Sequence, residues 1–319
     1  NSVGRFKRDM GTSKTYEING QTYTPTDLSA FVLKKLVQDT EKAVGSIADV
    51  IVSIPANFAN EARDATIAAA KAAELNIKYI VNEPTAAALY YAYKSGDELS
   101  GTYAVYDLGG GTFDISIIRV EGQDIEVLAA NGVAKCGGDD FDRTLHTLIK
   151  EKYKAATGEE LDEEDFSVND AEEEKKSLSK REKVLTRVVR QNIEITRSEF
   201  EESISSLISQ ARLATEATVD EVDISVNDLA GVFLVGGSTR IPAVQQSVRS
   251  IFGKDPISTA NVDEVVALGA AVYAAYKGDR SKLNAIQKKT IEQIKVDERT
   301  AMCFGTIAYD RERNDQYNS

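Results

Sequence analysis

Hydrophobic and polar positions along the chain predict alternating strands and helices, and one order of elements occurs twice. In the first copy, the apolar run Val50–Ile54 predicts a strand, and Ala62–Leu75 has the apolar spacing of an amphipathic helix. The segment Tyr79–Pro84 then leads into Thr85–Tyr93, whose small residues predict a second helix ending by Lys94–Asp97. The predicted order is therefore strand, helix, link, helix.

The second copy begins more than a hundred residues later. An apolar run at Val232–Val235 predicts a strand that ends at Gly236–Gly237. Pro242 opens a helix that stops before Gly253, and Val265–Tyr276 predicts an alanine-rich helix. The matching helix ends favour duplication of one unit, and the alternative is the ordinary alternation of any α/β protein.

The residues between the two copies predict a sheet followed by a charged subdomain. Thr102–Tyr106, Ile115–Val120 and Ile125–Ala129 are rich in β-branched and aromatic side chains, which favour strands. Leu145–Lys183 is strongly charged, and opposite charges recur at helical spacing. This spacing favours solvated helices of a peripheral subdomain over an acidic interaction tail.

The remaining segments predict a strand, a helix and a linker. Ile193–Thr196 alternates as a short strand, and Arg197–Glu216 is predicted to form one long helix. The pattern weakens after Lys282, so Asn284–Ser319 is expected to be a linker and the start of another domain. Because the sequence begins at Asn1 without a methionine, we expect it to be part of a longer polypeptide.

Composition limits the chemistry that the protein can perform. Of 319 residues, 42% are apolar, which is enough for a globular protein with a buried core. The net charge of −13 opposes nucleic-acid binding, which depends on basic contacts. One histidine, His146, and two cysteines, Cys136 and Cys303, exclude a pair of catalytic imidazoles and a four-thiolate zinc site. Without an apolar run of membrane-spanning length or a leader, we expect a soluble intracellular protein without membrane partners.

A glycine-rich segment between two predicted strands is the strongest candidate for a phosphate site. The segment contains three glycines, a threonine and two aspartates: Asp107, Gly109, Gly110, Gly111, Thr112 and Asp114. Consecutive glycines let backbone N–H groups approach an anion without interference from a Cβ atom. The aspartates have the wrong sign for bare phosphate, so they imply a hard cation, Mg²⁺, between them and the ligand. The alternative is a glycine-rich hairpin turn.

Two other glycine pairs are weaker signals. Gly236 and Gly237 precede Arg240, which predicts either an ordinary strand-to-helix turn or a close backbone approach to a ligand, with the arginine stacked on a base. Gly137 and Gly138 allow the same two interpretations.

Glu83 is the candidate for a further acidic group. It stands immediately before Pro84, at the predicted start of a helix. The carboxylate either caps this helix or orders water or Mg²⁺ opposite the glycine segment.

Four motifs in the same order resemble those of the DnaK-type heat-shock chaperone family: NEPTAAAL at 82–89, DLGGGTFD at 107–114, GGDDFD at 137–142 and LVGGSTRIP at 234–242. The resemblance runs from about Val3 to about Gly278, within the ATPase domain of that family. It implies an α/β fold with two lobes and internal duplication, as in actin and sugar kinases. This expectation agrees with the repeated order of elements.

The resemblance also implies a domain division. Lobe I is expected at 1–98, with the remnant of a peripheral subdomain at 1–23 and a core at 24–98. Lobe II is expected at 99–283, with its core at 99–136 and 205–283 and a peripheral subdomain at 137–204. A linker and the start of an incomplete substrate-binding domain are expected at 284–319.

Site residues follow from the resemblance position by position. The implied catalytic residues are Lys7, Glu83, Asp107 and Thr112, although Lys7 also fits an ordinary surface lysine. The implied nucleotide contacts are Gly109, Gly110, Gly111, Thr112, Gly137, Gly138, Glu172, Lys175, Lys176, Ser179, Gly236, Gly237, Ser238, Arg240 and Asp263. Asp107 and Asp114 are expected to hold Mg²⁺ through water, and Pro55 and Arg63 to relay the nucleotide state to a neighbouring domain.

The sequence departs from the family pattern at two places. Nothing before Lys7 supplies the family's first phosphate loop, so we expect these residues alone to bind ATP weakly or not at all, and their ATPase activity is an open question. Where the family has a leucine-rich linker, this sequence has the charged segment Ile294–Arg299, which puts coupling between domains in question.

The resemblance implies an ATP-dependent molecular chaperone that hydrolyses ATP to ADP with Mg²⁺, and with K⁺ as a further candidate, to control capture of unfolded polypeptides by a missing domain. It also implies a J-domain co-chaperone, a GrpE-like exchange factor, a heat-shock or stress-response role and a cytoplasmic location. The alternative is a non-hydrolytic interaction protein of the actin-like superfamily, either exchange-factor-like or a polymerising scaffold with Val265–Tyr276 as a polymer contact. A sugar kinase is a third option, without a recognisable acceptor site.

Overall fold

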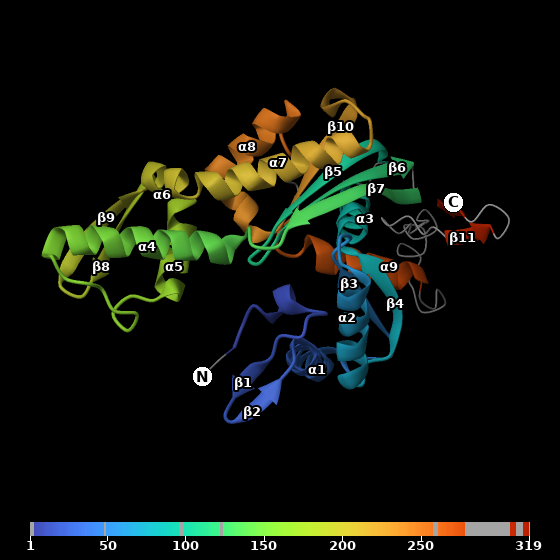
Figure 1. Cartoon of the computed structure of the whole chain (residues 1–319), viewed down its shortest axis with the longest axis horizontal. Coiled ribbons are helices and arrows are strands. Elements are labelled where there is room, and N and C mark those ends of the chain that lie inside the picture. The colour runs from blue at the N-terminus through green and yellow to red at the C-terminus, as the bar shows by residue number, and fades with distance from the viewer. Residues whose placement is uncertain are drawn as a thin grey trace.

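The computed structural model describes residues 3–47, 49–95, 99–121, 124–257 and 261–277, together with the backbone of two short strands, β11 (Ile307–Asp310) and β12 (Asp315–Asn318). The fold is mixed α/β, as the hydrophobic pattern predicted. Figure 1 shows a central sheet, an elongated arm on one side of it and the first elements of the chain below the arm.

The central sheet has the strand order β10–β5–β6–β7. It comprises β5 (Ser100–Leu108), β6 (Phe113–Glu121), β7 (Asp124–Val133) and β10 (Leu229–Val235), and only β10 runs parallel to its neighbour. Tyr106 and Leu108 of β5 lie in the main core on one face, whereas Tyr103 and Val105 lie in a second core on the other. Because both faces are covered, the strand residues are apolar almost without interruption.

The repeated unit predicted from the sequence is present in the structure. In the first copy, β3 (Val50–Ile54) pairs in parallel with β4 (Ile77–Asn82), and the helices are α2 (Asn60–Ala72) and α3 (Glu83–Ser95). In the second copy, β10 is followed by η3 (Gly237–Arg240), α8 (Pro242–Phe252) and α9 (Val265–Lys277). Phe233 of β10 also forms a parallel bridge with Ile257, at the position that corresponds to β4.

Helices α3 and α9 pack against each other with almost no space between their backbones. A Cβ atom at Gly269 would lie 1.7 Å from the carbonyl oxygen of Ala86. Ala86, Ala87 and Ala88 are fully buried, so small side chains on α3 permit this approach. Helix α9 is therefore an internal packing element, and its alternative interpretation as a polymer contact is wrong for the face that meets α3.

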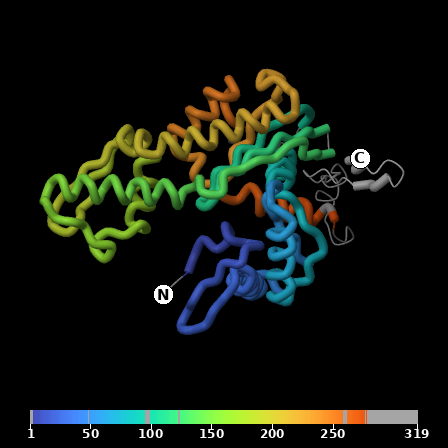
Figure 2. Tube along the Cα trace, in the orientation of Figure 1, coloured from blue at the N-terminus to red at the C-terminus, as the bar shows by residue number. Residues whose placement is uncertain are grey.

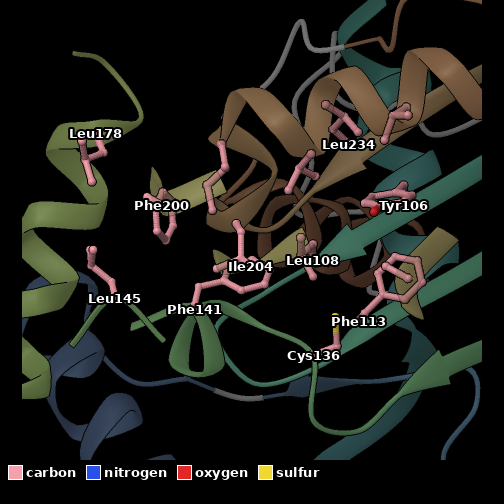
Figure 3. Packing of buried hydrophobic residues seen from close by; sticks show 14 of the residues in the cluster. Tyr106, Leu108, Phe113, Cys136, Phe141, Leu145, Leu178, Phe200, Ile204 and Leu234 are labelled. Carbon is pink, nitrogen blue, oxygen red and sulfur yellow. The ribbon is translucent and has the colours of Figure 1, made fainter. Parts of the chain in front are cut away.

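The arm consists of elements from the charged part of the sequence: α4 (Gly138–Thr157), α5 (Val168–Leu178), β8 (Lys183–Val188), β9 (Gln191–Thr196) and α6 (Arg197–Ser203). Its inner side chains, including Phe141, Leu145 and Leu178, belong to the main core that continues from Tyr106 and Leu108 of the sheet (Figure 3). The prediction of solvated helices is therefore confirmed for α4 and α5, which bury one face each.

The predicted long helix at 197–216 is wrong in one respect. The structure contains α6 and then α7 (Ser205–Glu221), with a break at Ile204. Ile204 is fully buried, and its φ of −94° and ψ of 3° are outside the helical values. The buried side chain of Ile204 holds the backbone in this break between α6 and α7, and hydrophobic periodicity alone does not reveal it.

The beginning of the chain forms elements to which the sequence pattern assigned no secondary structure. They are η1 (Phe6–Asp9), β1 (Tyr16–Ile18), β2 (Gln21–Tyr23) and α1 (Pro25–Val44). Much later in the chain, the short helix η2 (Val226–Asp228) precedes β10 and was also not predicted. A small hydrophobic cluster, here called the N-terminal cluster, joins Met10 to α1 and α2 through Ala30, Ala62, Ala69 and Ala73.

The domain division stays a prediction, and its main boundary at 98/99 lies at the edge of a short link, 96–98, outside the described residues. The charged linker segment 294–299 also lies outside them, as does most of the expected incomplete domain at 284–319. Among the described residues, no helix combines the length and the apolar character needed to cross a lipid bilayer.

Gly269→Ala tests the close packing of α3 and α9. We expect the variant to lower the free energy of unfolding by roughly 2 to 3 kcal/mol, because the new methyl group pushes the helices apart. Alanine would otherwise favour the helix by about 1 kcal/mol, so a loss identifies the clash. Urea denaturation followed by circular dichroism measures the change.

Gly4→Ala is the matched control, since a Cβ atom there meets nothing within 4 Å. A Gly269→Ala variant as stable as the native chain would contradict the packing described for these helices.

Candidate functional site

The glycine segment is the tight turn that joins β5 to β6. Asp107 pairs with Asp114 and Leu108 with Phe113 in the antiparallel register, so the turn itself is Gly109–Thr112. The amide of Gly109 donates to the carbonyl of Thr112 at 3.2 Å, and the Thr112 hydroxyl donates to Asp114 Oδ2 at 2.8 Å. The threonine therefore orients a carboxylate, and the hairpin places both aspartates side by side.

The three glycine turns that the sequence singled out lie against one another. The amides of Gly138 and Asp139 donate to the carbonyls of Gly109 and Gly110, at 2.9 and 2.8 Å. The Ser238 hydroxyl donates to the carbonyl of Gly109 at 3.0 Å, which joins the turn after β10 to the same loop.

Side chains would prevent these contacts. A Cβ atom at Gly137 would lie 2.7 Å from the carbonyl oxygen of Gly110. A Cβ atom at Gly236, where φ is +85°, would lie 2.4 Å from the carbonyl oxygen of Leu108. Glycine is therefore required at both positions, by space at the first and by space and backbone conformation at the second.

A pocket of about 600 Å³ opens beside the joined turns. Its lining includes ten residues that the resemblance assigned to nucleotide binding: Gly110, Gly138, Glu172, Lys175, Lys176, Ser179, Gly237, Ser238, Arg240 and Asp263. This volume is in the range of pockets that hold small ligands. The five other predicted contacts, Gly109, Gly111, Thr112, Gly137 and Gly236, belong to the same turns but do not line the pocket.

Ion pairs hold the charged side chains around the pocket. Lys175 Nζ lies 2.7 Å from Asp142 Oδ1, and their side chains are only 10% and 3% exposed. Burial raises the pKa of Asp142, and the hydrogen bond and charge of Lys175 oppose this shift. Across the pocket, Arg240 Nη2 lies 2.8 Å from Asp263 Oδ2. The buried pair holds Lys175 in place without a ligand, whereas the pair of Arg240 and Asp263 is half exposed.

A cluster of three carboxylates and one ammonium group lies on the other side of the glycine loop. Lys7 Nζ is 3.0 Å from Glu83 Oε1, although 59% of the lysine side chain is exposed. Desolvation opposes the charge of Lys7, but Glu83, Asp107 and Asp114 outweigh it and raise the pKa of the lysine. The structure therefore brings together the predicted groups from η1, α3 and the β5–β6 hairpin.

The two aspartates are difficult to ionise in this cluster. Burial raises the pKa of Asp107 well above its usual value, and the charges of Glu83 and Asp114 add to the shift. Burial also raises the pKa of Asp114 to about 6, whereas the hydrogen bonds from Thr112 and Asn57 and the charge of Lys7 oppose it. When all three carboxylates are ionised, a single lysine leaves them under-compensated, which favours a bound cation.

An enclosed cavity of about 10 Å³ lies within the cluster and is lined by Pro55, Asn57, Glu83, Asp107 and Asp114, among others. This volume is close to that needed by a single water molecule. The cavity therefore places a water-sized space against Glu83.

Pro55 and Arg63, the pair expected to relay the nucleotide state, both lie close to this cluster. Pro55 lines the cavity, and Arg63 Nη1 donates to Asn82 Oδ1 at 3.5 Å, next to Glu83 in the chain. Their role in communication stays a prediction.

Asp107 and Asp114 fit a magnesium ion that keeps its own waters. Within the described residues, no group of three histidine, cysteine, aspartate or glutamate side chains is close enough to hold a metal directly. Mg²⁺ commonly retains several waters and binds through one or two carboxylates together with phosphate. Two adjacent, partly buried carboxylates with raised pKa values provide that donor set through water, as the resemblance implied.

Sequence reasoning missed several residues of the site. Arg5 and Arg8 form ion pairs with Asp139 and Asp140, and Asp142 holds Lys175. A signal was present for Arg8, because it follows Lys7 directly, but nothing in the sequence indicates its acidic partner 132 positions later.

The glycine turns, the pocket and the carboxylate cluster fit a nucleotide-binding domain. The duplicated α/β units are those of the two-lobed, actin-like ATPase fold. Residues 6–291 match the family described as Hsp70 protein, and the chain belongs to the Hsp70 family. The suspected resemblance to DnaK-type heat-shock chaperones is confirmed by this match.

Asp114→Asn tests the electrostatic cost of the carboxylate cluster. The pKa of Asp114 is about 6 in the folded protein and about 3.9 in an unfolded chain, so the folded state binds the extra proton between these values. Stability therefore falls as pH rises from about 4 to 6. At about pH 7.5 without Mg²⁺, we expect the variant to raise the free energy of unfolding by about 2 kcal/mol, and by almost nothing at pH 4.

Urea denaturation at both pH values measures this difference, and Asp220→Asn, at an exposed position of α7, is the control. A variant that is less stable than the native chain at pH 7.5 would contradict the described cluster.

Proposed function

We propose that this chain binds Mg·ATP and hydrolyses it to ADP and phosphate. One observation carries the proposal: three separate glycine turns meet between a ligand-sized pocket and a cluster of Lys7, Glu83, Asp107 and Asp114. Membership of the Hsp70 family, whose members bind ATP or ADP with Mg²⁺, supports the same proposal.

The pocket and the turns would bind different parts of the nucleotide. The pocket beside α5 and η3 would hold adenosine, with Arg240 available to stack on the base and Lys175 and Ser179 on the opposite wall. The phosphates would extend toward the Gly109–Gly111 turn, where the amides of Gly110 and Gly111 can donate to their oxygens.

The carboxylate cluster would perform the hydrolytic step. Mg²⁺, when bound, would neutralise charge on the phosphates and would be held through water by Asp107 and Asp114. Glu83 would position the attacking water in the adjacent cavity, and the ammonium group of Lys7 would stabilise negative charge on the terminal phosphate. Phosphoryl transfer depends on positioning and electrostatics, so the site requires no protein nucleophile.

We further propose that ATP turnover in this chain controls the binding of unfolded polypeptides, as expected of an Hsp70 chaperone. A J-domain co-chaperone and a GrpE-like exchange factor are the proposed partners, with a stress-response role in the cytoplasm. The family match supports the proposed clients and co-chaperones, whereas the stress-response role and the location rest on the sequence resemblance.

Glu83→Gln and Thr112→Ala test the assigned roles in hydrolysis. Glu83→Gln removes a carboxylate beside the water-sized cavity, and Thr112→Ala removes the hydrogen bond that orients Asp114. We expect Glu83→Gln to slow single-turnover hydrolysis on the order of a hundredfold, and to change nucleotide affinity far less. Quenched-flow measurements with protein in excess, together with calorimetry, separate the two effects.

Glu216→Gln, in an exposed ion pair with Arg212 on α7, is the control for a general effect of charge. An unchanged hydrolysis rate in the Glu83 variant would contradict the role assigned to Glu83. Nucleotide binding without hydrolysis by the native chain would favour the alternative, a nucleotide-binding protein that does not rely on hydrolysis.

Suppression of aggregation tests the chaperone proposal. We expect the intact protein to reduce light scattering by a thermally unfolding reporter enzyme more strongly with one nucleotide state than with the other, because the proposal links client binding to the nucleotide. ATP and ADP are compared at equal concentration. Scattering by the chain alone on addition of ATP, without an effect on the reporter, would instead indicate a polymerising scaffold.

A further inference from the structure

Arg5 and Arg8 belong to the side of the molecule that contains α1 and α2. Met10, two residues after Arg8, packs in the N-terminal cluster against Ala30 and Ala62. Gly11 follows, and a Cβ atom there would lie 2.6 Å from the amide nitrogen of Ala62. The segment that carries both arginines is therefore attached to α1 and α2.

Asp139 and Asp140 belong to the opposite side. They lie in the first turn of α4, next to Phe141, which is fully buried in the main core. Asp140 Oδ2 accepts a hydrogen bond from the amide of Gly137 at 3.1 Å, and the amide of Asp139 donates to Gly110. These carboxylates are therefore fixed to the phosphate loop and to the arm.

Ion pairs connect the two sides directly. The Arg8 guanidinium contacts both carboxylate oxygens of Asp140, through Nη2 to Oδ2 at 2.8 Å and Nη1 to Oδ1 at 3.3 Å. It also donates to the carbonyl of Gly110 at 3.4 Å, and Arg5 Nε lies 2.7 Å from Asp139 Oδ2. Figure 2 shows the N-terminal segment running beneath the junction of β7 and α4.

These pairs lie where a bound nucleotide would have to leave. Asp139 lines the 600 Å³ pocket, and Arg8 covers the glycine turn, since a Cβ atom at Gly111 would lie 3.1 Å from Arg8 Nε. The contact between α3 and α9 is packed too tightly to separate. Opening therefore requires the sides to rotate about α3 and α9 and the arginine pairs to break.

We propose that Arg5 and Arg8, with Asp139 and Asp140, form an electrostatic latch that holds the two sides of the site together and slows nucleotide release. The part of this inference that concerns nucleotide release rests on the proposed function. The contact between the two sides does not depend on nucleotide.

The geometry of Arg8 and Asp140 distinguishes them from ordinary surface ion pairs. Their side chains are 13% and 14% exposed, and two nearly parallel N–H···O contacts join them. Such bidentate pairs are stronger than exposed single contacts. Loss of the pair is expected to accelerate release roughly tenfold, the equivalent of about 1.4 kcal/mol. The more exposed pair of Arg5 and Asp139 is expected to contribute less.

Stopped-flow release of a fluorescent ADP analogue tests the latch. We expect roughly tenfold faster release from Arg8→Gln and a smaller increase from Arg5→Gln. Higher ionic strength is expected to accelerate release from the native chain, because salt screens the two ion pairs. It is expected to have little effect on the variant that carries both Arg5→Gln and Arg8→Gln, because that variant lacks both pairs. Arg8→Lys retains the charge and is expected to give an intermediate rate.

Arg143→Gln is the matched control. Arg143 contacts the same carboxylate, with Nη1 3.4 Å from Asp140 Oδ1, but it belongs to α4 and does not join the two sides. Release from this variant is expected to equal that from the native chain. Equal rates for Arg8→Gln and the native chain would overturn the proposal.

Hydrogen exchange of the nucleotide-free chain tests the closure separately. We expect Arg8→Gln to accelerate exchange roughly fivefold in both 3–12 and 137–145, and Arg143→Gln to leave segment 3–12 unchanged. Acceleration in segment 3–12 alone would show that Arg8 orders only its own segment, which overturns the latch. If ADP does not bind to the native chain, the proposed function and the release step both fail, and exchange still decides whether the sides are latched.

Discussion

The structure depends on the close contact of three backbone turns at the end of the β5–β6 hairpin. The carbonyls of Gly109 and Gly110 accept hydrogen bonds from the turn before α4, and Ser238 joins the turn after β10 to the same point. Side chains at Gly137 or Gly236 would collide with this backbone. The contact fixes the arm, the sheet and the second repeat relative to one another, so the pocket exists without a ligand.

The charge distribution around this contact follows the needs of a bound anion and cation rather than those of stability. Asp107 and Asp114 are held together with Glu83 although burial and mutual repulsion raise the pKa values of both aspartates. A single lysine does not compensate three carboxylates. Such a cluster is costly in a folded protein, and a bound divalent cation would lower the cost, which would tie cation binding to the stability of the fold.

Much of this arrangement was predictable from local sequence, and the remainder was not. The apolar runs gave β3 and β10, and the glycine segment gave the hairpin turn, because these features depend on neighbouring residues. Ten residues that the motif resemblance assigned to one site line a common pocket in the structure, and their role in nucleotide binding stays a prediction. The break at Ile204 and the pairing of Arg8 with Asp140 depend on contacts between distant segments, which hydrophobic periodicity does not report.

The central claim is that the glycine turn at 109–111 binds the terminal phosphates of a nucleotide through its backbone amides at Gly110 and Gly111. Two-dimensional ¹H–¹⁵N NMR of the chain, titrated with Mg²⁺ and a non-hydrolysable ATP analogue, tests it even if the affinity is low. The account predicts saturable shifts of the amide signals of these three glycines, together with those of Gly138 and Gly237 at the pocket. Shifts confined to other parts of the chain, with the glycine signals unmoved, would contradict it.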